Sequence, residues 1–387
     1  MHNSAHPFPT FTCIDLRALA HNLTQVRSRI PAACGILAVV KANAYGHGAV
    51  PITNALRQFG IAQFGVATVD EGAALRAAGV DASILVMGAV TAGEFPDLIS
   101  AKLTPVLYRS ELVQRFAAEV DRLTPGSTAY PVHLKVDTGM GRLGITLQEL
   151  AETVASPALL RGTLRLEGIM SHLADADNQD PTYTQSQIHE FDEAIRLLTR
   201  EGRLPELVHL ANSAGILLHP SSHHRLVRPG IMLYGYHTLP ALPSGVTLRP
   251  VLSWQTTVAH LRTVEAGASV SYNRTFVATR RSRIAVLPVG YADGYNRLLS
   301  NRGRVLVRGR RASVVGRVCM DMTMIDVTDC PGAAIGDPVV LIGRQEQEGI
   351  SAEEMAGWLQ TIPYEVLCAI GTRVPRIYQP ADPASAQ

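Results

Sequence analysis

Eight short apolar segments recur through the first 230 residues, and most of them lack the polar alternation of a half-exposed strand. Such segments are typical of strands that a parallel sheet buries on both faces. A helical stretch or a short helical turn follows each one. Eight such units without a reversal of strand order favour a (β/α)8 barrel of the TIM type over an open doubly wound sheet. We expect strands at about 35–41, 63–67, 83–88, 104–108, 132–137, 164–171, 207–211 and 224–228.

The 387 residues of the chain exceed a barrel of about 250 residues and leave room for a second domain. A Pro-rich segment at 237–245 is typical of an interdomain linker. Beyond it the pattern changes to strands with turn signals, and one helix follows Ser351, where the spacing to Glu354 predicts a capping box. We predict four parts: an N-terminal extension at 1–12, the barrel at 13–240, a mostly β domain at 250–380, and a disordered tail at 381–387.

The distribution of charge and of cysteines argues against several classes of protein. The 35 basic and 33 acidic residues are interspersed, which argues against a nucleic-acid or membrane partner. The five cysteines are scattered without a CxxC pair, which argues for reduced thiols and against a disulfide framework or a metal site. No signal-peptide pattern opens the chain, and no apolar run approaches the roughly 20 residues of a membrane span. These features predict a cytoplasmic protein.

Lys41 is the first polar side chain after the apolar run from Ile36 to Val40. Burial of an ammonium group without a partner is costly, so a buried lysine at this strand end would tend to lose its proton. That is the state a Schiff-base lysine needs. On the residues alone, a lysine that ends a strand and extends into solvent is the commoner alternative.

Residues 39–48, with the sequence VVKANAYGHG, resemble the pyridoxal phosphate (PLP) lysine motif of the alanine racemase family. The resemblance implies that Lys41 binds the cofactor covalently. It extends over nearly the whole chain through further segments: HLKVDTGMGRLG at 133–144, GIMSH at 168–172, HLANSAG at 209–215, VRPGI at 227–231, VSYNRTF at 270–276, GYADGY at 290–295, GRVCMD at 316–321 and IPYE at 362–365.

The segment at 133–144 also contains a formal GxGxxG. A dinucleotide site is the weaker interpretation, because no clear helix opens at the third glycine. The resemblance instead implies that Arg142 orients the substrate carboxylate and a cofactor oxygen, and that Lys135 is carbamylated and holds Arg142. Without the modification two cations would be adjacent. A surface salt bridge is the alternative for Arg142.

The resemblance assigns further barrel residues to the cofactor. It places His172 under the pyridine ring, in hydrogen-bonding distance of a catalytic tyrosine, and Arg228 against the ring nitrogen. A lone strand-end histidine is otherwise more often structural. The phosphate is expected to be bound by Ser213 with Asn212 beside it, by the backbone amides of Gly230 and Ile231, and by Tyr45 and Tyr364.

Arg228 bears directly on the type of reaction. Most PLP enzymes set a carboxylate against the ring nitrogen and keep it protonated. An arginine does not yield a proton to that nitrogen, so the ring stays neutral. Less electron density then moves into the ring, which favours return of the proton to Cα over transamination.

Racemisation needs a base on each face of Cα, and the resemblance assigns these roles to Lys41 and Tyr272. A free tyrosine has a pKa near 10, so His172 and nearby positive charge must assist it. The resemblance also implies a homodimer in which Tyr272 and Met320 reach the partner's active site, with the Met320 amide at the substrate carboxylate and Tyr291 at the entrance. A tyrosine packed at a domain seam is the alternative for Tyr272.

We therefore predict a PLP-dependent isomerase, an alanine racemase that supplies D-alanine for peptidoglycan. A broad-specificity amino-acid racemase is an alternative, because Asn273 stands where alanine racemases often have glycine. A fold-related decarboxylase is disfavoured, since it would set a glutamate at the ring nitrogen. From another class, a non-catalytic PLP-binding barrel protein would lack the C-terminal β domain.

Overall fold

The structure is a computed structural model that describes residues 8–126 and 129–380. The predicted disordered tail at 381–387 and most of the predicted extension at 1–12 lie outside these residues. The described chain forms two compact units. The barrel unit contains residues 20–44 and 49–248, and the β unit contains residues 8–19, 45–48 and 249–380.

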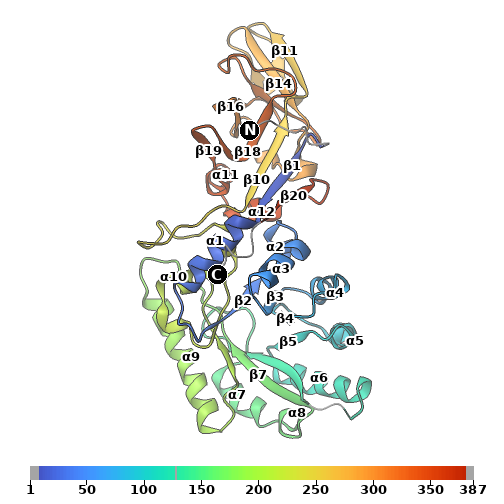
Figure 1. The fold of residues 1–387 in the computed structure, drawn as a ribbon, viewed down its shortest axis with the longest axis vertical. Coiled ribbons are helices and arrows are strands. Elements are labelled where there is room, and N and C mark those ends of the chain that lie inside the picture. The colour runs from blue at the N-terminus through green and yellow to red at the C-terminus, as the bar shows by residue number, and fades with distance from the viewer. Residues whose placement is uncertain (1–7, 127–128, 381–387) are drawn as a thin grey trace. The chain divides into compact units, whose positions relative to one another are not determined.

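Eight parallel strands form the barrel unit, so the predicted barrel is confirmed (Figure 1). Their order is β8-β7-β6-β5-β4-β3-β2-β9. The ring is completed where the Arg225 amide donates to the Val208 carbonyl at 3.1 Å and the Arg228 amide donates to the Ala211 carbonyl at 3.0 Å. The strands are β2 (Gly35–Val39), β3 (Gln63–Val66), β4 (Ser83–Val86), β5 (Thr104–Leu107), β6 (Tyr130–Lys135), β7 (Leu164–Met170), β8 (Leu207–His209) and β9 (Leu226–Val227).

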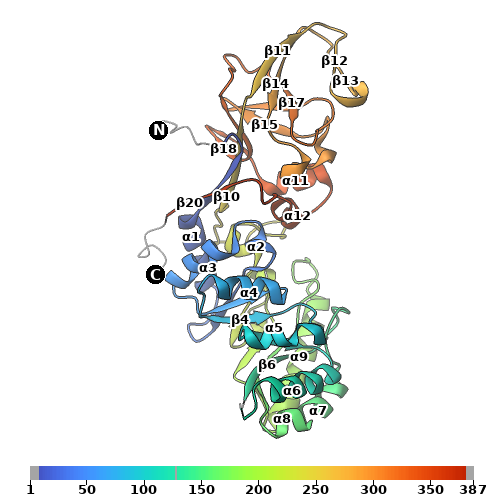
Figure 2. The same cartoon turned by 90° about the vertical axis from the view of Figure 1, so that its right-hand side faces the viewer.

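Helices cover the outside of these strands, as Figure 2 shows for α4, α5 and α6. Along α6 the buried residues recur every three or four positions, from Leu112 to Val120, and so form one apolar stripe against the strands. The helices are α1 (Leu16–Arg27), α3 (Ala49–Gln58), α4 (Val69–Ala77), α5 (Phe95–Ser100), α6 (Ser110–Leu123), α7 (Leu147–Val154), α8 (Pro157–Leu160), α9 (Thr182–Arg200) and α10 (Ser213–Leu218). The segment labelled α2 (Lys41–Tyr45) is a left-handed turn.

The β unit is built on a sheet with the order β11-β14-β17-β16-β15-β18-β10-β1-β20, and β19 pairs with β18. Its strands are β10 (Leu252–Thr257), β11 (His260–Val264), β14 (Ser282–Leu287), β15 (Arg304–Val307), β16 (Arg310–Val314), β17 (Thr323–Asp326), β18 (Pro338–Gln345), β19 (Glu348–Ile350) and β20 (Arg376–Gln379). A two-stranded ribbon, β12 (Ser269–Val270) and β13 (Phe276–Val277), and two helices, α11 (Ala352–Leu359) and α12 (Pro363–Cys368), complete it.

The first strand of the chain, β1 (Phe11–Asp15), also lies in this sheet. It pairs antiparallel with β10 and parallel with β20. The proposed domain bounds of 13–240 and 250–380 therefore leave part of β1 in the sheet of the other domain. The predicted linker at 237–245 contains no helix or strand.

The predicted capping box at the start of α11 forms only in half. The Ser351 hydroxyl accepts a hydrogen bond from the Glu354 amide at 3.1 Å. The Glu354 carboxylate does not return to Ser351, because it accepts two hydrogen bonds from the Arg311 guanidinium at 2.5 and 3.2 Å. A guanidinium that donates to both carboxylate oxygens forms a stronger pair than one bond from a backbone amide.

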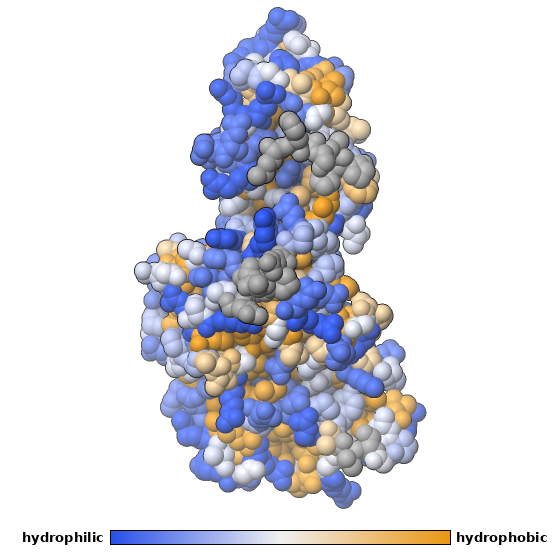
Figure 3. Space-filling view, in the orientation of Figure 1, coloured by the Kyte–Doolittle hydropathy of each residue, from blue (hydrophilic) through white to orange (hydrophobic). Residues whose placement is uncertain are grey.

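The surface mixes residue types. Figure 3 shows hydrophilic residues spread over the drawn face with hydrophobic patches between them. Among the helices of the described chain, none combines the length and the apolar character that a membrane crossing requires.

Candidate active site

Lys41 directly follows the buried end of β2 and opens an unusual turn. Residues Ala42 to Tyr45 all have φ between 51° and 54°, the left-handed region. Such a conformation costs about 1–2 kcal/mol for each residue that is not glycine. The Lys41 side chain is exposed, which agrees with the alternative of a lysine that ends a strand and extends into solvent. The apolar run ends at Val40, and the turn begins with the next residue.

Two side chains hold this turn by hydrogen bonds: Glu71, from helix α4, and Asn43, from the turn itself. The Glu71 carboxylate accepts from the Ala42 amide at 2.7 Å and from the Ala67 amide at 2.7 Å. The Asn43 side chain accepts from the Ala49 amide at 2.8 Å. Strained backbone that is fixed in this way is characteristic of functional sites. The geometry therefore supports a functional role for the segment that begins with Lys41.

Ser213 and Gly230 come together beside the carboxyl ends of β8 and β9. The Ser213 hydroxyl accepts from the Gly230 amide at 3.0 Å and from the Met232 amide at 3.3 Å. These amides belong to the start of a short 3-10 turn, η3 (Ile231–Tyr234). A hydroxyl among successive backbone amides is a setting that suits an anion such as a phosphate. Asn212 lies next to it and caps α10, where its Oδ1 accepts from the Gly215 amide at 2.9 Å.

Arg228 is buried inside the barrel and held on several sides. One terminal nitrogen donates to the Ser171 carbonyl at 2.7 Å, to the Leu210 carbonyl at 3.0 Å and to Nδ1 of His172 at 3.2 Å. The other lies 3.2 Å from Nδ1 of His209. Burial lowers the pKa of Arg228 to about 9, which leaves the group protonated at neutral pH. The result is a fixed, positively charged donor.

His172 is a neutral imidazole in this setting. Burial first, and then the charge of Arg228, hold its pKa well below the usual value. Because Arg228 only donates, Nδ1 of His172 is an acceptor and the ring proton lies on Nε2. His172 is therefore able to donate one hydrogen bond from Nε2.

Lys135 is 4% exposed and lies among positive charges. Burial is the main cause that lowers its pKa to about 8, and the charges of Arg142, Arg228 and Lys41 add to it. Asp137 acts in the opposite direction. An unmodified Lys135 is thus a buried cation close to other cations, one of which, Arg142, is the neighbour expected from the sequence.

The loop after β6 does not form a dinucleotide site. The Asp137 carboxylate accepts from the amides of Gly139 and Gly141 at 3.0 and 3.1 Å. The third glycine, Gly144, opens no helix, since α7 begins only at Leu147. A Cβ added at Gly144 would lie 2.3 Å from the Asp137 nitrogen, so this glycine is needed for packing of the loop.

Three predicted site residues lie on neighbouring loops of the β unit and expose large side chains: Tyr272 at 68%, Tyr291 at 42% and Met320 at 53%. The Tyr291 amide donates to the Cys319 carbonyl at 3.1 Å, which joins two of these loops. The Ser271 hydroxyl donates to the Arg317 carbonyl at 2.8 Å and joins the third. Large exposed side chains on joined loops are typical of an interaction site, and we call Tyr272, Tyr291 and Met320 together the Tyr272 face.

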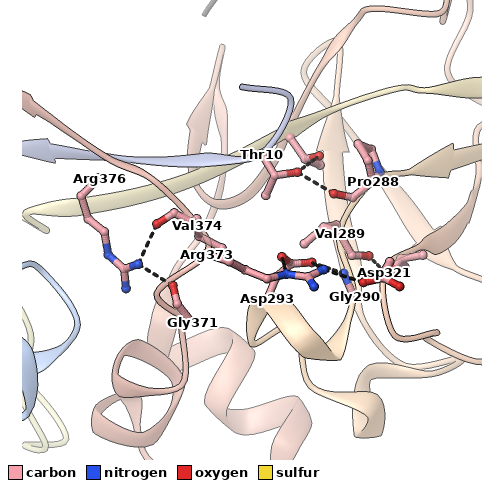
Figure 4. A network of polar contacts seen from close by, with 12 residues as sticks. Thr10, Pro288, Val289, Gly290, Asp293, Asp321, Gly371, Arg373, Val374 and Arg376 are labelled. Atoms are coloured by element: carbon pink, nitrogen blue, oxygen red, sulfur yellow. Dashed lines mark hydrogen bonds and ion pairs between the residues drawn. The ribbon is translucent and has the colours of Figure 1, made fainter. Parts of the chain in front are cut away.

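A buried carboxylate and an arginine hold these loops together (Figure 4). Arg373 donates from Nε to Asp293 at 2.7 Å and from a terminal nitrogen to Asp321 at 2.6 Å. Asp293 in turn accepts from the Gly290 amide at 2.9 Å. A Cβ at Gly290 would lie 2.3 Å from the Cys319 carbonyl oxygen, so the two loops are in close contact.

Tyr45 and Tyr364, the predicted pair of phosphate-binding tyrosines, lie side by side in the β unit. Their ring centroids are 5.8 Å apart with the planes inclined by 55°. Tyr45 is 6% exposed, so its side chain is almost fully enclosed by neighbouring residues.

Several residues that shape the site were not predicted from the sequence. A local pattern could have indicated Glu71, because Thr68-x-x-Glu71 is a capping-box pattern, and the structure forms that box. A local pattern could also have indicated His209, since it is a polar residue at the end of a short buried strand. Asp293 and Arg373 are 80 positions apart in the chain, and no local pattern links them.

Comparison with known proteins identifies the family of this chain. The family described as "Alanine racemase, N-terminal domain" matches residues 14–238, and "Alanine racemase, C-terminal domain" matches residues 251–378. An alanine racemase from Geobacter sp. (strain M21) is 46% identical over 383 residues, which cover 96% of this chain and 98% of that protein.

Solved structures extend the comparison to the fold. The crystal structure of alanine racemase from E. faecalis has a TM-score of 0.90 at 36% identity and covers 98% of this chain and 100% of its own. Alanine racemase from Bartonella henselae, a structure with covalently bound pyridoxal phosphate, has a TM-score of 0.85 at 31% identity and covers 96% of this chain and 100% of its own.

Proposed function

This chain belongs to the alanine racemase family, and we propose that it interconverts L-alanine and D-alanine with PLP as cofactor and with Lys41 and Tyr272 as its two bases. The observation that carries the proposal is the fixed Arg228 guanidinium, because an arginine at this position directs PLP chemistry toward racemisation. When bound, PLP withdraws electrons from Cα and makes its hydrogen acidic.

The barrel unit offers groups that fit this cofactor. Lys41 supplies the amine for covalent attachment, on a turn held in position by Glu71. The Ser213 hydroxyl and the amides of Gly230 and Ile231 bind the phosphate, and Asn212 supports them by capping α10. Tyr45 and Tyr364 belong to the β unit, and the family resemblance adds their phenol groups to those that would bind the phosphate. The donor set matches a phosphate, since every member has an N–H or O–H to offer.

Two further residues control the proton at the reacting atom. Arg228 would face the pyridine nitrogen of a bound cofactor and, because a guanidinium only donates, would give it no proton. His172 would lie beside the ring, and its Nε2–H would donate to the phenol oxygen of Tyr272, which favours the phenolate that a base requires. Lys41 and Tyr272 then act on opposite faces of Cα: one removes the hydrogen and the other returns a proton.

The substrate carboxylate is bound by Arg142 and by the Met320 amide, and Tyr291 lies at the entrance. We place Tyr272 and Met320 in the active site of a second copy of the chain, so that a homodimer is the active form. The exposed face that carries Tyr272, Tyr291 and Met320 supports this assembly. Light scattering of the purified protein tests it directly.

The cellular role follows from the reaction. D-alanine is a building block of peptidoglycan, and we place its synthesis by this protein in the cytoplasm. Cys13, Cys34, Cys319 and Cys330 are free thiols, which supports a reducing compartment. A non-catalytic PLP carrier is the second candidate. We favour the racemase, because such a carrier would lack the β unit that bears Tyr272.

We expect racemisation to be confined mainly to alanine. The PLP-loaded protein is incubated separately with L-alanine, L-serine and L-lysine, and chiral chromatography follows the D-isomer, with Lys41→Ala as the blank. Comparable rates on serine or lysine would assign the chain to the broad-specificity racemases and give weight to Asn273. Bound PLP without any D-isomer would favour the carrier.

We also expect Lys135 to be carbamylated. Carbon dioxide adds to a neutral amine, with loss of a proton, and the low pKa of about 8 makes that form abundant as pH rises through 8. The resulting anion would lie among Arg142, Arg228 and Lys41. With 13C-labelled bicarbonate, a carbamate signal should grow between pH 7 and pH 9 and disappear in Lys135→Met.

Lys102 serves as the control, because it is an exposed lysine outside the site, and Lys102→Met should leave the carbamate signal unchanged. A signal that persists in Lys135→Met, or its absence from the unmodified sequence at pH 9, would contradict carbamylation.

A further inference from the structure

A continuous line of polar groups runs through the barrel from Arg228 to a carboxylate that the proposed mechanism does not use. Nδ1 of His209 lies 3.2 Å from the Arg228 guanidinium, and its Nε2 lies 2.8 Å from Nδ1 of His133. Nε2 of His133 lies 3.4 Å from Glu167. The two imidazole rings meet edge to face, with centroids 5.0 Å apart.

The hydrogen bonds along this line all run in one direction, from Arg228, which only donates, to Glu167, which only accepts. Arg228 only donates, so Nδ1 of His209 accepts and its proton lies on Nε2. Nδ1 of His133 must then accept from His209, which leaves the proton of His133 on Nε2, facing Glu167. Glu167 is ionised and only accepts. Each ring therefore has a single tautomer that satisfies both of its neighbours.

The backbone is shaped to make room for the line. The pairing of β6 with β7 shifts between Val132, opposite Leu166, and His133, opposite Gly168, so Glu167 is the extra residue of a bulge. Bulges of this kind turn a side chain in a new direction. A Cβ on Gly168 would lie 2.4 Å from the His133 ring, so only glycine leaves space for that imidazole.

The charges of the groups along this line also agree with a connection between Arg228 and Glu167. Among the described residues, no carboxylate lies within ion-pair distance of Arg228, whose partners are carbonyls and imidazoles. Burial keeps the pKa of both His133 and His209 low, so both rings are neutral. The His133 ring and the Arg165 guanidinium lower the pKa of Glu167 to about 2. A neutral bridge thus joins a buried cation to a carboxylate that stays charged.

We propose that Glu167 is a positioning residue for Arg228 and acts on it through His133 and His209. The line holds the guanidinium in one orientation, as a donor toward the cofactor ring, and supplies its distant counter-charge. This inference rests on the role proposed above for Arg228. It adds three residues to the reaction that touch neither substrate nor cofactor.

Histidine ring 15N NMR of the PLP-loaded protein, and of the same protein before loading, tests the line. In Glu167→Leu we expect the signals of His209 to shift, although the ion-pair partners of Glu167 among the described residues are His133 and Arg165. Glu167→Gln keeps an acceptor and should give a smaller shift. Arg165→Gln is the matched control, because Arg165 contacts Glu167 from outside the line at 2.8 Å. It should leave His209 unchanged.

The pyruvate released per racemisation event measures the effect on Arg228, because transamination of alanine to pyruvate is the side reaction that Arg228 suppresses. Glu167→Leu should raise this ratio about tenfold. In a His209→Leu background, Glu167→Leu should add nothing further, since the line is already broken.

Three results would overturn the proposal: unchanged His209 signals in Glu167→Leu, additive effects in the double variant, or an equal change in Arg165→Gln. A protein that fails to racemise alanine would instead overturn the proposed function. The NMR comparison before PLP loading still tests the line in that case, so the two failures are distinguishable.

Discussion

Lys41→Ala should abolish racemisation, with a fall of at least about 10⁴-fold, because the variant loses both a base and the amine that attaches the cofactor. It should also lose the covalent label when the PLP-loaded protein is reduced with borohydride, digested and analysed by mass spectrometry. The chain contains three lysines, Lys41, Lys102 and Lys135, so the labelled peptide is unambiguous.

Lys102→Ala is the matched control, since Lys102 is an exposed lysine outside the site. It should keep both activity and label. The Lys41 side chain is exposed, so its removal should leave the folded chain stable and a loss of activity is not due to unfolding. A label on Lys102 or Lys135, or racemisation by Lys41→Ala at near the normal rate, would contradict the assignment.

Tyr272→Phe should slow racemisation about 10³-fold and do so with a stereochemical signature. One base remains, so the α-hydrogen of only one alanine enantiomer should still exchange in D2O, with retention of configuration. The other enantiomer should lose exchange together with racemisation. Proton NMR of L-alanine and D-alanine, incubated separately, measures both.

Tyr108→Phe provides the control, because it removes a phenol hydroxyl that donates to the Val90 carbonyl in the barrel unit. It should leave exchange of both enantiomers intact. Tyr272 is 68% exposed, so the loss of its hydroxyl should not alter stability. Exchange of both enantiomers at undiminished rates in Tyr272→Phe would exclude this tyrosine as a base.

Much of the fold was predictable because it depends on local pattern. A parallel strand buried on both faces has to be an apolar run, so segments such as 83–88 and 104–108 are visible without neighbours. Helices are also visible locally where apolar residues recur at helical spacing, as in α3 (Ala49–Gln58) and α6 (Ser110–Leu123). The eight-fold alternation then led to the barrel.

The half-formed capping box has a different cause, which is competition between partners distant in sequence. Glu354 has the right spacing to cap α11, yet its carboxylate binds the Arg311 guanidinium. Short-range patterns contain no information about which of two partners is the stronger.

The sequence by itself determined the order of strands and helices, the two-part division and the residues that resemble a PLP site, because these depend on side-chain periodicity and on local motifs. Only the tertiary structure decided that β1 pairs in the sheet of the β unit, that Glu71 holds the turn after Lys41, and that Glu167 connects to Arg228. Each of these depends on hydrogen bonds between segments far apart in the chain, and their geometry exists only after the backbone has closed around them.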